Sequence, residues 1–167
     1  MILAVDVDYR GNYASIGGVT FANWEDNEEI ASFHSDLYDI EQYTPGKFYR
    51  RELPCILKLI EEHLLKPNFI VIDGFVYLDG VSEPGLGKHL YDALNGNVPI
   101  IGLAKKQFKN ISPNFSIYRG SSKNPLYVTS VGIGFEVAKE LIASMHGKYR
   151  IPNLLKKVDQ VCRKHIS

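Results

Sequence analysis

The sequence predicts an α/β fold with a mixed β-sheet that begins as an antiparallel meander, continues with parallel strands and is flanked by helices. Two continuous apolar runs, at residues 2–5 and 69–72, are typical of strands that are covered on both faces. Turn-rich links separate the first predicted strands, and after residue 46 the apolar residues recur at helical spacing. A sheet that starts without helices and then alternates with them is expected to be mixed.

The first half of the chain supplies the meander and one helix. Strands are predicted at 2–6, 14–22 and 29–35, and a helix follows over roughly 46–65. Pro54 lies inside this helix and predicts either a kink or a later true start, because proline removes one helical hydrogen bond.

The second half alternates between the two kinds of element. Strands are predicted at 69–73, 98–104 and 126–130, and helices at 86–94, 134–146 and 153–165. This order suits a ribonuclease H-like architecture. Flavodoxin-like and other doubly wound folds are the alternative, although they need a helix directly after the first strand.

Length and composition suit an ordinary globular protein. The 167 residues, with 45% hydrophobic content, fit a single domain over 1–167. No apolar stretch approaches a membrane span, and Met1 leads directly into a predicted strand without a signal peptide, so we expect a cytoplasmic protein with no membrane partner. We also expect a monomer. Cys55 and Cys162 are expected to pack as small hydrophobes. Cys162 and His165 have a metal-like spacing but lack a second pair.

Charge is balanced overall but uneven along the chain. There are 19 acidic and 19 basic residues, which argues against a nonspecific nucleic-acid coat. Nine of the acids lie in residues 1–42, with a single base, and the later bases form clusters such as Lys105 with Lys106 and Lys148 with Arg150. Each cluster is either a phosphate-facing surface or a solvated helix face, and the second is the commoner case.

Two acidic residues end the two apolar runs. Asp6 follows residues 2–5, and Asp73 follows residues 69–72. In open α/β sheets, ligands bind beyond the carboxyl ends of the strands, and two neighbouring carboxylates there repel each other unless a cation lies between them. Asp73 with Gly74 could also be a simple turn, so the pair is the stronger indication of a metal site.

Two further acids lie on the apolar stripes of predicted helices. Glu52 precedes Ile56 by four residues, and Asp159 follows Leu155 by four, so each shares the core-facing side. A carboxylate placed there costs several kcal/mol unless it is paired or binds a cation. A salt bridge from Arg50 or Lys156 is one solution. Convergence with Asp6 and Asp73 is the other, and such oxygen ligands favour Mg²⁺ or Mn²⁺.

Six segments carry recognisable motifs in a fixed order. They are Asp6 with its neighbours, Tyr43-Thr44-Pro45-Gly46 with Arg51-Glu52, Ile72-Asp73-Gly74, residues 99–106 (Pro-Ile-Ile-Gly-Leu-Ala-Lys-Lys), Asn124-Pro125-Leu126-Tyr127, and Lys148-Tyr149-Arg150-Ile151-Pro152 with Asp159. Together, and over nearly the whole chain, they resemble the endonuclease V family, which has a ribonuclease H-like fold.

This resemblance implies a function and a set of residues. Asp6, Glu52, Asp73 and Asp159 would be catalytic metal ligands for Mg²⁺, with Mn²⁺ able to substitute, and Lys105 would be the catalytic lysine. Nucleic-acid contacts would come from Tyr43, Thr44, Pro45 and Gly46, acting as a wedge beside the lesion, and from Arg51 and Lys106. The substrate would be inosine-containing DNA or single-stranded RNA, with the hypoxanthine base rotated out and the strand cut on its 3′ side to leave 3′-hydroxyl and 5′-phosphate ends.

The chain also departs from the family pattern. Residues 75–85 contain no His or Arg where the family has His-Pro-Arg, and Val131-Gly132-Ile133 replaces a Gly-His-Arg segment. His89 matches a different, helical histidine of the family. Lost basic groups would weaken phosphate binding, so two alternatives stay open: a protein that binds damaged nucleic acid with little or no cleavage, and another ribonuclease H-like nuclease such as a junction resolvase.

Overall fold

The first three strands form the predicted antiparallel meander. They are β1 (Ile2–Arg10), β2 (Tyr13–Phe21) and β3 (Ala31–Tyr38). The computed structural model of the protein describes residues 1–42, 45, 47 and 49–164. The first strand is longer than predicted, because β1 continues beyond Asp6 to Arg10 while it pairs with β2. Asp6 therefore lies within β1 and not at its tip.

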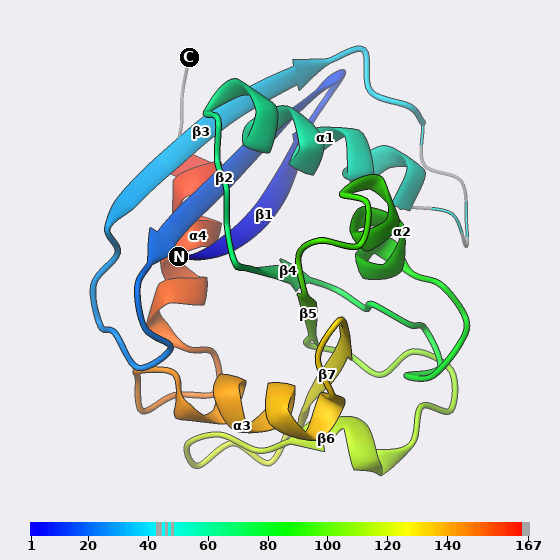
Figure 1. The fold of residues 1–167 in the computed structure, drawn as a ribbon, viewed down its shortest axis with the longest axis vertical. Coiled ribbons are helices and arrows are strands. Elements are labelled where there is room, and N and C mark those ends of the chain that lie inside the picture. The colour runs from blue at the N-terminus through cyan, green and yellow to red at the C-terminus, as the bar shows by residue number, and fades with distance from the viewer. Residues whose placement is uncertain (43–44, 46, 48, 165–167) are drawn as a thin grey trace.

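The later elements complete a mixed sheet. They are α1 (Tyr49–Glu62), β4 (Phe69–Asp73), α2 (Leu86–Ala93), β5 (Ile100–Ala104), a short 3₁₀ helix at Pro113–Phe115, β6 (Ser116–Ile117), β7 (Leu126–Val131), α3 (Phe135–Ser144) and α4 (Asn153–Lys164). The described strands are arranged in the order β3-β2-β1-β4-β5-β7-β6 (Figure 1). Among the described strands, β1 pairs with β4 and β4 pairs with β5 in parallel, whereas β7 runs antiparallel to both β5 and β6.

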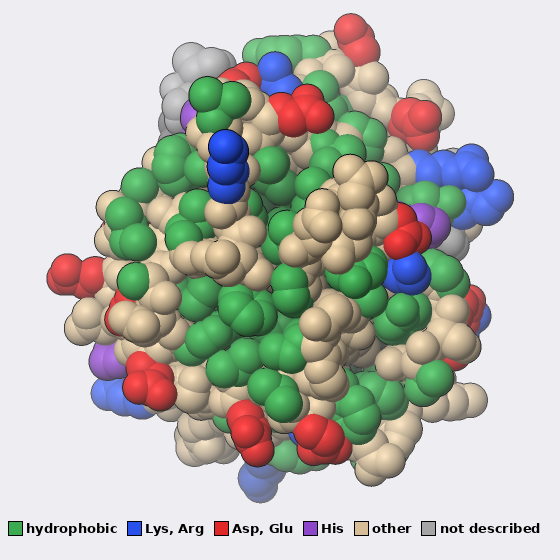
Figure 2. Space-filling model, viewed as in Figure 1, with side chains coloured by type: hydrophobic (Ala, Val, Ile, Leu, Met, Phe, Trp, Pro, Cys, Tyr) green, Lys and Arg blue, Asp and Glu red, His purple; other side chains and the backbone are tan. Residues whose placement is uncertain are grey.

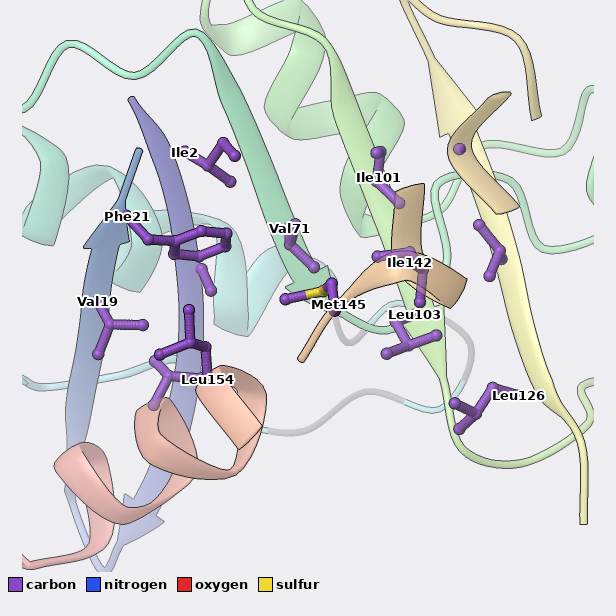
Figure 3. Close-up of a cluster of buried hydrophobic side chains, with 14 of the residues drawn as sticks. Ile2, Val19, Phe21, Val71, Ile101, Leu103, Leu126, Ile142, Met145 and Leu154 are labelled. Atoms are coloured by element: carbon purple, nitrogen blue, oxygen red, sulfur yellow. The ribbon is translucent and has the colours of Figure 1, made fainter. Parts of the chain in front are cut away.

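Helices cover both faces of the sheet. On one face α1 and α2 pack against the strands, with Ile56, Leu59 and Leu90 buried. On the other face, α3 and α4 cover a second apolar cluster, and Figure 3 shows Val71, Ile101 and Leu103 of the sheet pointing towards Ile142, Met145 and Leu154. Burial of each such side chain contributes about 1.5–3 kcal/mol, so these two layers hold the helices in place.

A pair of adjacent glycines sets how closely two helices approach the sheet. Gly17 and Gly18 lie in β2, opposite Asp6 and Val5 of β1. A Cβ atom at Gly17 would lie 2.8 Å from the backbone nitrogen of Cys162 in α4, and one at Gly18 would lie 2.7 Å from the Leu59 side chain in α1. The missing side chains thus allow α4 and α1 to come close to the sheet at the level of Asp6.

The outer surface in Figure 2 has its charges dispersed. Hydrophobic side chains gather in the middle of this face, and acidic and basic groups are scattered around its rim. Both cysteines are buried and unbridged, as predicted. Within the described residues, no helix has the length and apolar character needed to cross a membrane.

Candidate active site

Asp6 and Asp73 lie where the ladder between β1 and β4 stops. The last parallel pair is Val5 with Ile72, and each acid is the next residue of its strand. Both carboxyl groups line the same two small hollows, one on each face of the sheet. The predicted proximity of these two acids is therefore confirmed. Burial first, and then the charge of Asp73, raise the pKa of Asp6 to about 7.

Glu52 reaches this position from the first turn of α1. It lines one hollow together with Asp6, Asp73 and the apolar residues Ile56 and Leu86. Burial, followed by repulsion from Asp73 and Asp6, raises the pKa of Glu52 to about 8, although Arg51 opposes the shift. The interpretation of Glu52 as a core-facing acid is borne out, and burial with the two neighbouring acids disfavours its anionic form more than Arg51 favours it.

Asp159 arrives from α4 on the opposite face. Its carboxylate accepts a hydrogen bond from the carboxyl group of Asp6, and its Oδ1 accepts one of 2.8 Å from Nε of Arg163. Burial acts to raise the pKa of Asp159, but these hydrogen bonds hold it below its ordinary value. Because α4 packs closely against Gly17, Asp159 can contact Asp6 although the two acids are 153 residues apart in the sequence.

Cys162 lies next to Asp6 and Asp159. Ligand atoms of Asp6, Asp159 and Cys162 all lie within 4.8 Å of one another. The Cys162 thiol is buried, donates to the Asp159 carbonyl at 3.2 Å, and has its pKa raised to about 12, mainly by burial. A neutral thiol is a poor ligand for a hard cation, so Cys162 belongs to the packing of α4. His165 lies outside the described residues.

Lys105 follows β5 and extends to the same edge. Its Nζ lies 3.7 Å from Oδ2 of Asp73, and both side chains are 43% exposed. Burial raises the pKa of Asp73, and the charge of Lys105 opposes that shift. Lys105 also lines the hollow on the α4 side with Asp6 and Asp73. The next residue, Lys106, is exposed to solvent beside it.

Arg150 fixes the backbone that carries Lys105. Its guanidinium donates hydrogen bonds to the carbonyl oxygens of Lys105 at 2.6 Å, Pro125 at 2.9 Å and Asn124 at 3.1 Å. Three segments far apart in the sequence are thereby joined next to the acids. Arg150 belongs to a recognisable motif, but its structural role could not be predicted from the sequence, because its partners are main-chain atoms that no residue type identifies.

The loop after Asp73 is held by strand β7 and by local hydrogen bonds. Val76 donates its N–H to Oγ1 of the buried Thr129 at 2.8 Å. Asp79 accepts from the backbone N–H groups of Val81, Ser82 and Glu83, which lower its pKa, and Glu83 pairs with Lys109 at 3.0 Å. The two acids of this loop are therefore already engaged away from the four carboxylates.

The nucleic-acid contacts expected around residue 45 are only partly described. Tyr43, Thr44 and Gly46 lie outside the described residues, and Pro45 is exposed in a turn. The guanidinium of Arg51 lies 3.6 Å from the centre of the Tyr9 ring. Buried nitrogen Nε of Arg51 and the Tyr9 hydroxyl have no hydrogen-bond partner among the described residues. His89 of α2 stacks on Tyr49 of α1, with ring centres 3.7 Å apart.

The donor set fits a divalent cation. Asp6, Glu52 and Asp73 offer oxygen atoms, and the raised pKa values of Asp6 and Glu52 show that their anionic forms are disfavoured without added positive charge. Hard oxygen donors in this number match Mg²⁺ or Mn²⁺ better than a thiol-preferring metal.

The strand order, with acids gathered where β1 and β4 separate, defines a protein of ribonuclease H-like fold. One similar solved structure is Endonuclease V from Ciona intestinalis in complex with a 24mer DNA containing an inosine followed by a ribo-adenosine. The alignment covers 98% of this chain and 84% of the Ciona intestinalis chain, at a TM-score of 0.78 and 16% identity. The chain belongs to the Endonuclease V family, because the family model of that description matches residues 1–122.

Other relatives agree with this assignment. Endonuclease V of Rippkaea orientalis is 28% identical over an alignment of 189 positions, which covers 96% of this chain and 78% of the relative. The crystal structure of Endonuclease V from Streptomyces avermitilis aligns at a TM-score of 0.74 and 25% identity, over 98% of this chain and 79% of its own. The present chain is shorter than each of these relatives.

Proposed function

We propose that this protein is a Mg²⁺-dependent endonuclease that acts on inosine-containing DNA or RNA. It hydrolyses a phosphodiester on the 3′ side of the deaminated nucleotide and leaves 3′-hydroxyl and 5′-phosphate ends. Family membership supports the reaction class. The observation that carries the proposal is the convergence of Asp6, Asp73, Glu52 and Asp159 from two strands and two helices.

Each residue has a proposed role. Asp6, Glu52, Asp73 and Asp159 would hold Mg²⁺, or Mn²⁺ in its place. The bound cation would activate water and stabilise the leaving oxygen. Lys105, 3.7 Å from Asp73, would stabilise the charge that develops on the phosphate. Tyr43 to Gly46 would act as the wedge, and Arg51 and Lys106 would contact the strand.

The substrate follows from relatives and from chemistry. The Ciona intestinalis protein is solved with inosine-containing DNA. A flipped hypoxanthine leaves a gap in the stack, which a tyrosine beside a stiff proline turn can fill. We extend this substrate class to the present chain, with both DNA and RNA as candidates.

A second candidate is binding of inosine-containing strands with little cleavage. The loop at 75–85 favours it, because this loop has Asp79 and Glu83 but no His or Arg. Against it stand Asp6 and Glu52, since a protein that only binds has no need for acids that are costly in the absence of a cation.

Cleavage of end-labelled strands with a single inosine, in DNA and RNA versions, tests the proposal. Wild type and Asp73→Ala are compared in Mg²⁺, in Mn²⁺ and in EDTA. A metal-dependent cut 3′ of inosine that disappears in Asp73→Ala is expected. Tight binding of the inosine strand without a cut would favour the second candidate, and cleavage of four-way junctions in preference to inosine strands would indicate a resolvase.

A further inference from the structure

A basic and aromatic surface lies between α3 and α4, outside the residues assigned above. We name Lys148, Tyr149 and Lys156 the 148–156 patch. The Tyr149 side chain is 56% exposed, and the ammonium groups of Lys156 and Lys148 lie 4.6 Å and 5.4 Å from the centre of its ring. Neither lysine takes part in an ion pair among the described residues, so both are available to an external anion.

The backbone beneath the patch is fixed by a buried arginine. Arg119, with 7% of its surface exposed, donates to the carbonyl oxygens of Met145 at 2.6 Å, Tyr149 at 2.8 Å, Gly147 at 3.0 Å and Arg150 at 3.3 Å. A guanidinium bound to four carbonyls holds this loop in one shape. The loop therefore presents Tyr149 without a large entropic cost on binding.

The same loop leads directly into the candidate active site. Ile151 and Leu155 line the hollow that contains Asp6, Asp73 and Lys105. Tyr149 precedes Ile151 by two residues, so their Cα atoms are at most about 7 Å apart. Lys156 directly follows Leu155. One strand of a duplex advances about 3.4 Å per nucleotide, which places the patch within a few nucleotides of the acids.

The groove beside the ring provides space for a ligand. It is open to solvent, is lined by His146, Gly147, Lys148, Tyr149 and Asn153, and has a volume of about 490 Å³. An exposed aromatic ring flanked by unpaired positive charges is the combination by which proteins bind nucleic-acid strands, because bases stack on the ring and phosphates meet the lysines.

We infer that the 148–156 patch binds the substrate strand a few nucleotides away from the phosphate that is cut. A base stacks on Tyr149, and Lys148 and Lys156 bind neighbouring phosphates. This inference rests on the proposed function, since it assumes a nucleic-acid substrate, and it adds a second contact region to the one expected at residues 43–46.

Binding is measured by fluorescence anisotropy of a labelled 20mer single strand with one inosine, in EDTA so that no cleavage occurs, at several salt concentrations. Lys148→Gln and Lys156→Gln should each reduce the slope of log Kd against log salt by about 0.7. Tyr149→Ala should raise Kd about tenfold without changing that slope, and Tyr149→Phe should retain the wild-type Kd.

Two matched variants serve as controls. Lys66→Gln removes an exposed lysine that precedes β4, at the end of the sheet opposite the acids, and Tyr38→Ala removes a 55% exposed tyrosine on the edge strand β3. Both should leave the Kd and the salt slope at wild-type values. Circular dichroism of each variant checks that the fold is retained.

The outcomes separate this inference from the proposed function. In Mg²⁺, Tyr149→Ala should raise the KM for cleavage and leave kcat within about twofold. Wild-type Kd and salt slopes in Lys148→Gln, Lys156→Gln and Tyr149→Ala, with cleavage intact, would overturn the patch and leave the nuclease proposal standing. A wild type that binds no strand would overturn both.

Discussion

Replacing Gly17 with alanine tests how the four carboxylates are brought together. A Cβ at this position would lie 2.8 Å from the backbone nitrogen of Cys162 and 3.0 Å from the backbone oxygen of Val158, whereas ordinary contacts begin at 3.4 Å. Backbone atoms cannot rotate away, so α4 must move outward by about 0.6 Å. Overpacking of this kind costs about 1–3 kcal/mol of stability.

This displacement should also reach the chemistry, because Asp159 lies in the same turn of α4. A misplacement of 1 Å can cost about a hundredfold in rate, so Gly17→Ala should lower kcat roughly tenfold. Urea denaturation gives the stability, and cleavage of an inosine strand at saturating Mg²⁺ gives kcat.

Gly134→Ala is the matched control. A Cβ there would meet no atom within 4 Å, although the residue caps α3. It should lose at most about 1 kcal/mol of stability and keep wild-type kcat. If Gly17→Ala kept the wild-type kcat, the close packing of α4 against β2 would not position the catalytic acids, and the reasoning would be wrong.

Three further perturbations address other parts of the site. The pKa is raised to about 7 for Asp6 and to about 8 for Glu52. Without metal, the contribution of these two acids to the free energy of unfolding is therefore fully present below about pH 4 and is lost as the pH rises towards 8. Urea midpoints in EDTA should therefore fall from pH 5 to pH 9, and Mg²⁺ should restore stability most at pH 9; a flat profile in EDTA would contradict these shifts. Arg150→Gln should lose about 2 kcal/mol of stability and about tenfold in kcat, because the Lys105 carbonyl loses its donor, while the Mg²⁺-induced rise in Tm persists; unchanged kcat would remove the positioning role. Lys105→Met should lower kcat about a hundredfold and tighten Mg²⁺ binding measured by calorimetry, since Asp73 loses a competing cation; weaker Mg²⁺ binding would show that Lys105 supports the acids in another way.

Much of the fold could be predicted from periodicity. The runs before Asp6 and Asp73 are apolar on every residue because both faces of β1 and β4 are covered, and this signal is local. The extension of β1 to Arg10 was missed because it depends on pairing with β2. The strand β6, only two residues long, is too short to have a period.

Some residues of the candidate site could likewise be predicted from the sequence, and others could not. Glu52 and Asp159 could be found from the sequence because a charged residue on an apolar helical stripe is anomalous in itself. Arg119 and Arg150 could not, since they act through carbonyl oxygens, which every residue has. The role of Gly17 depends on where a helix more than 130 residues later comes to lie, and a glycine alone does not indicate that.

Calorimetric titration with Mn²⁺ at pH 8 tests most directly whether the four carboxylates form one cation site. Wild type is compared with Asp6→Asn, Glu52→Gln, Asp73→Asn and Asp159→Asn, and Glu83→Gln, whose side chain pairs with Lys109, serves as the control. We expect each of the four variants to bind Mn²⁺ at least about tenfold more weakly than wild type, as loss of one charged ligand requires. A wild-type affinity for Mn²⁺ in all four variants would show that these four carboxylates do not form the cation site.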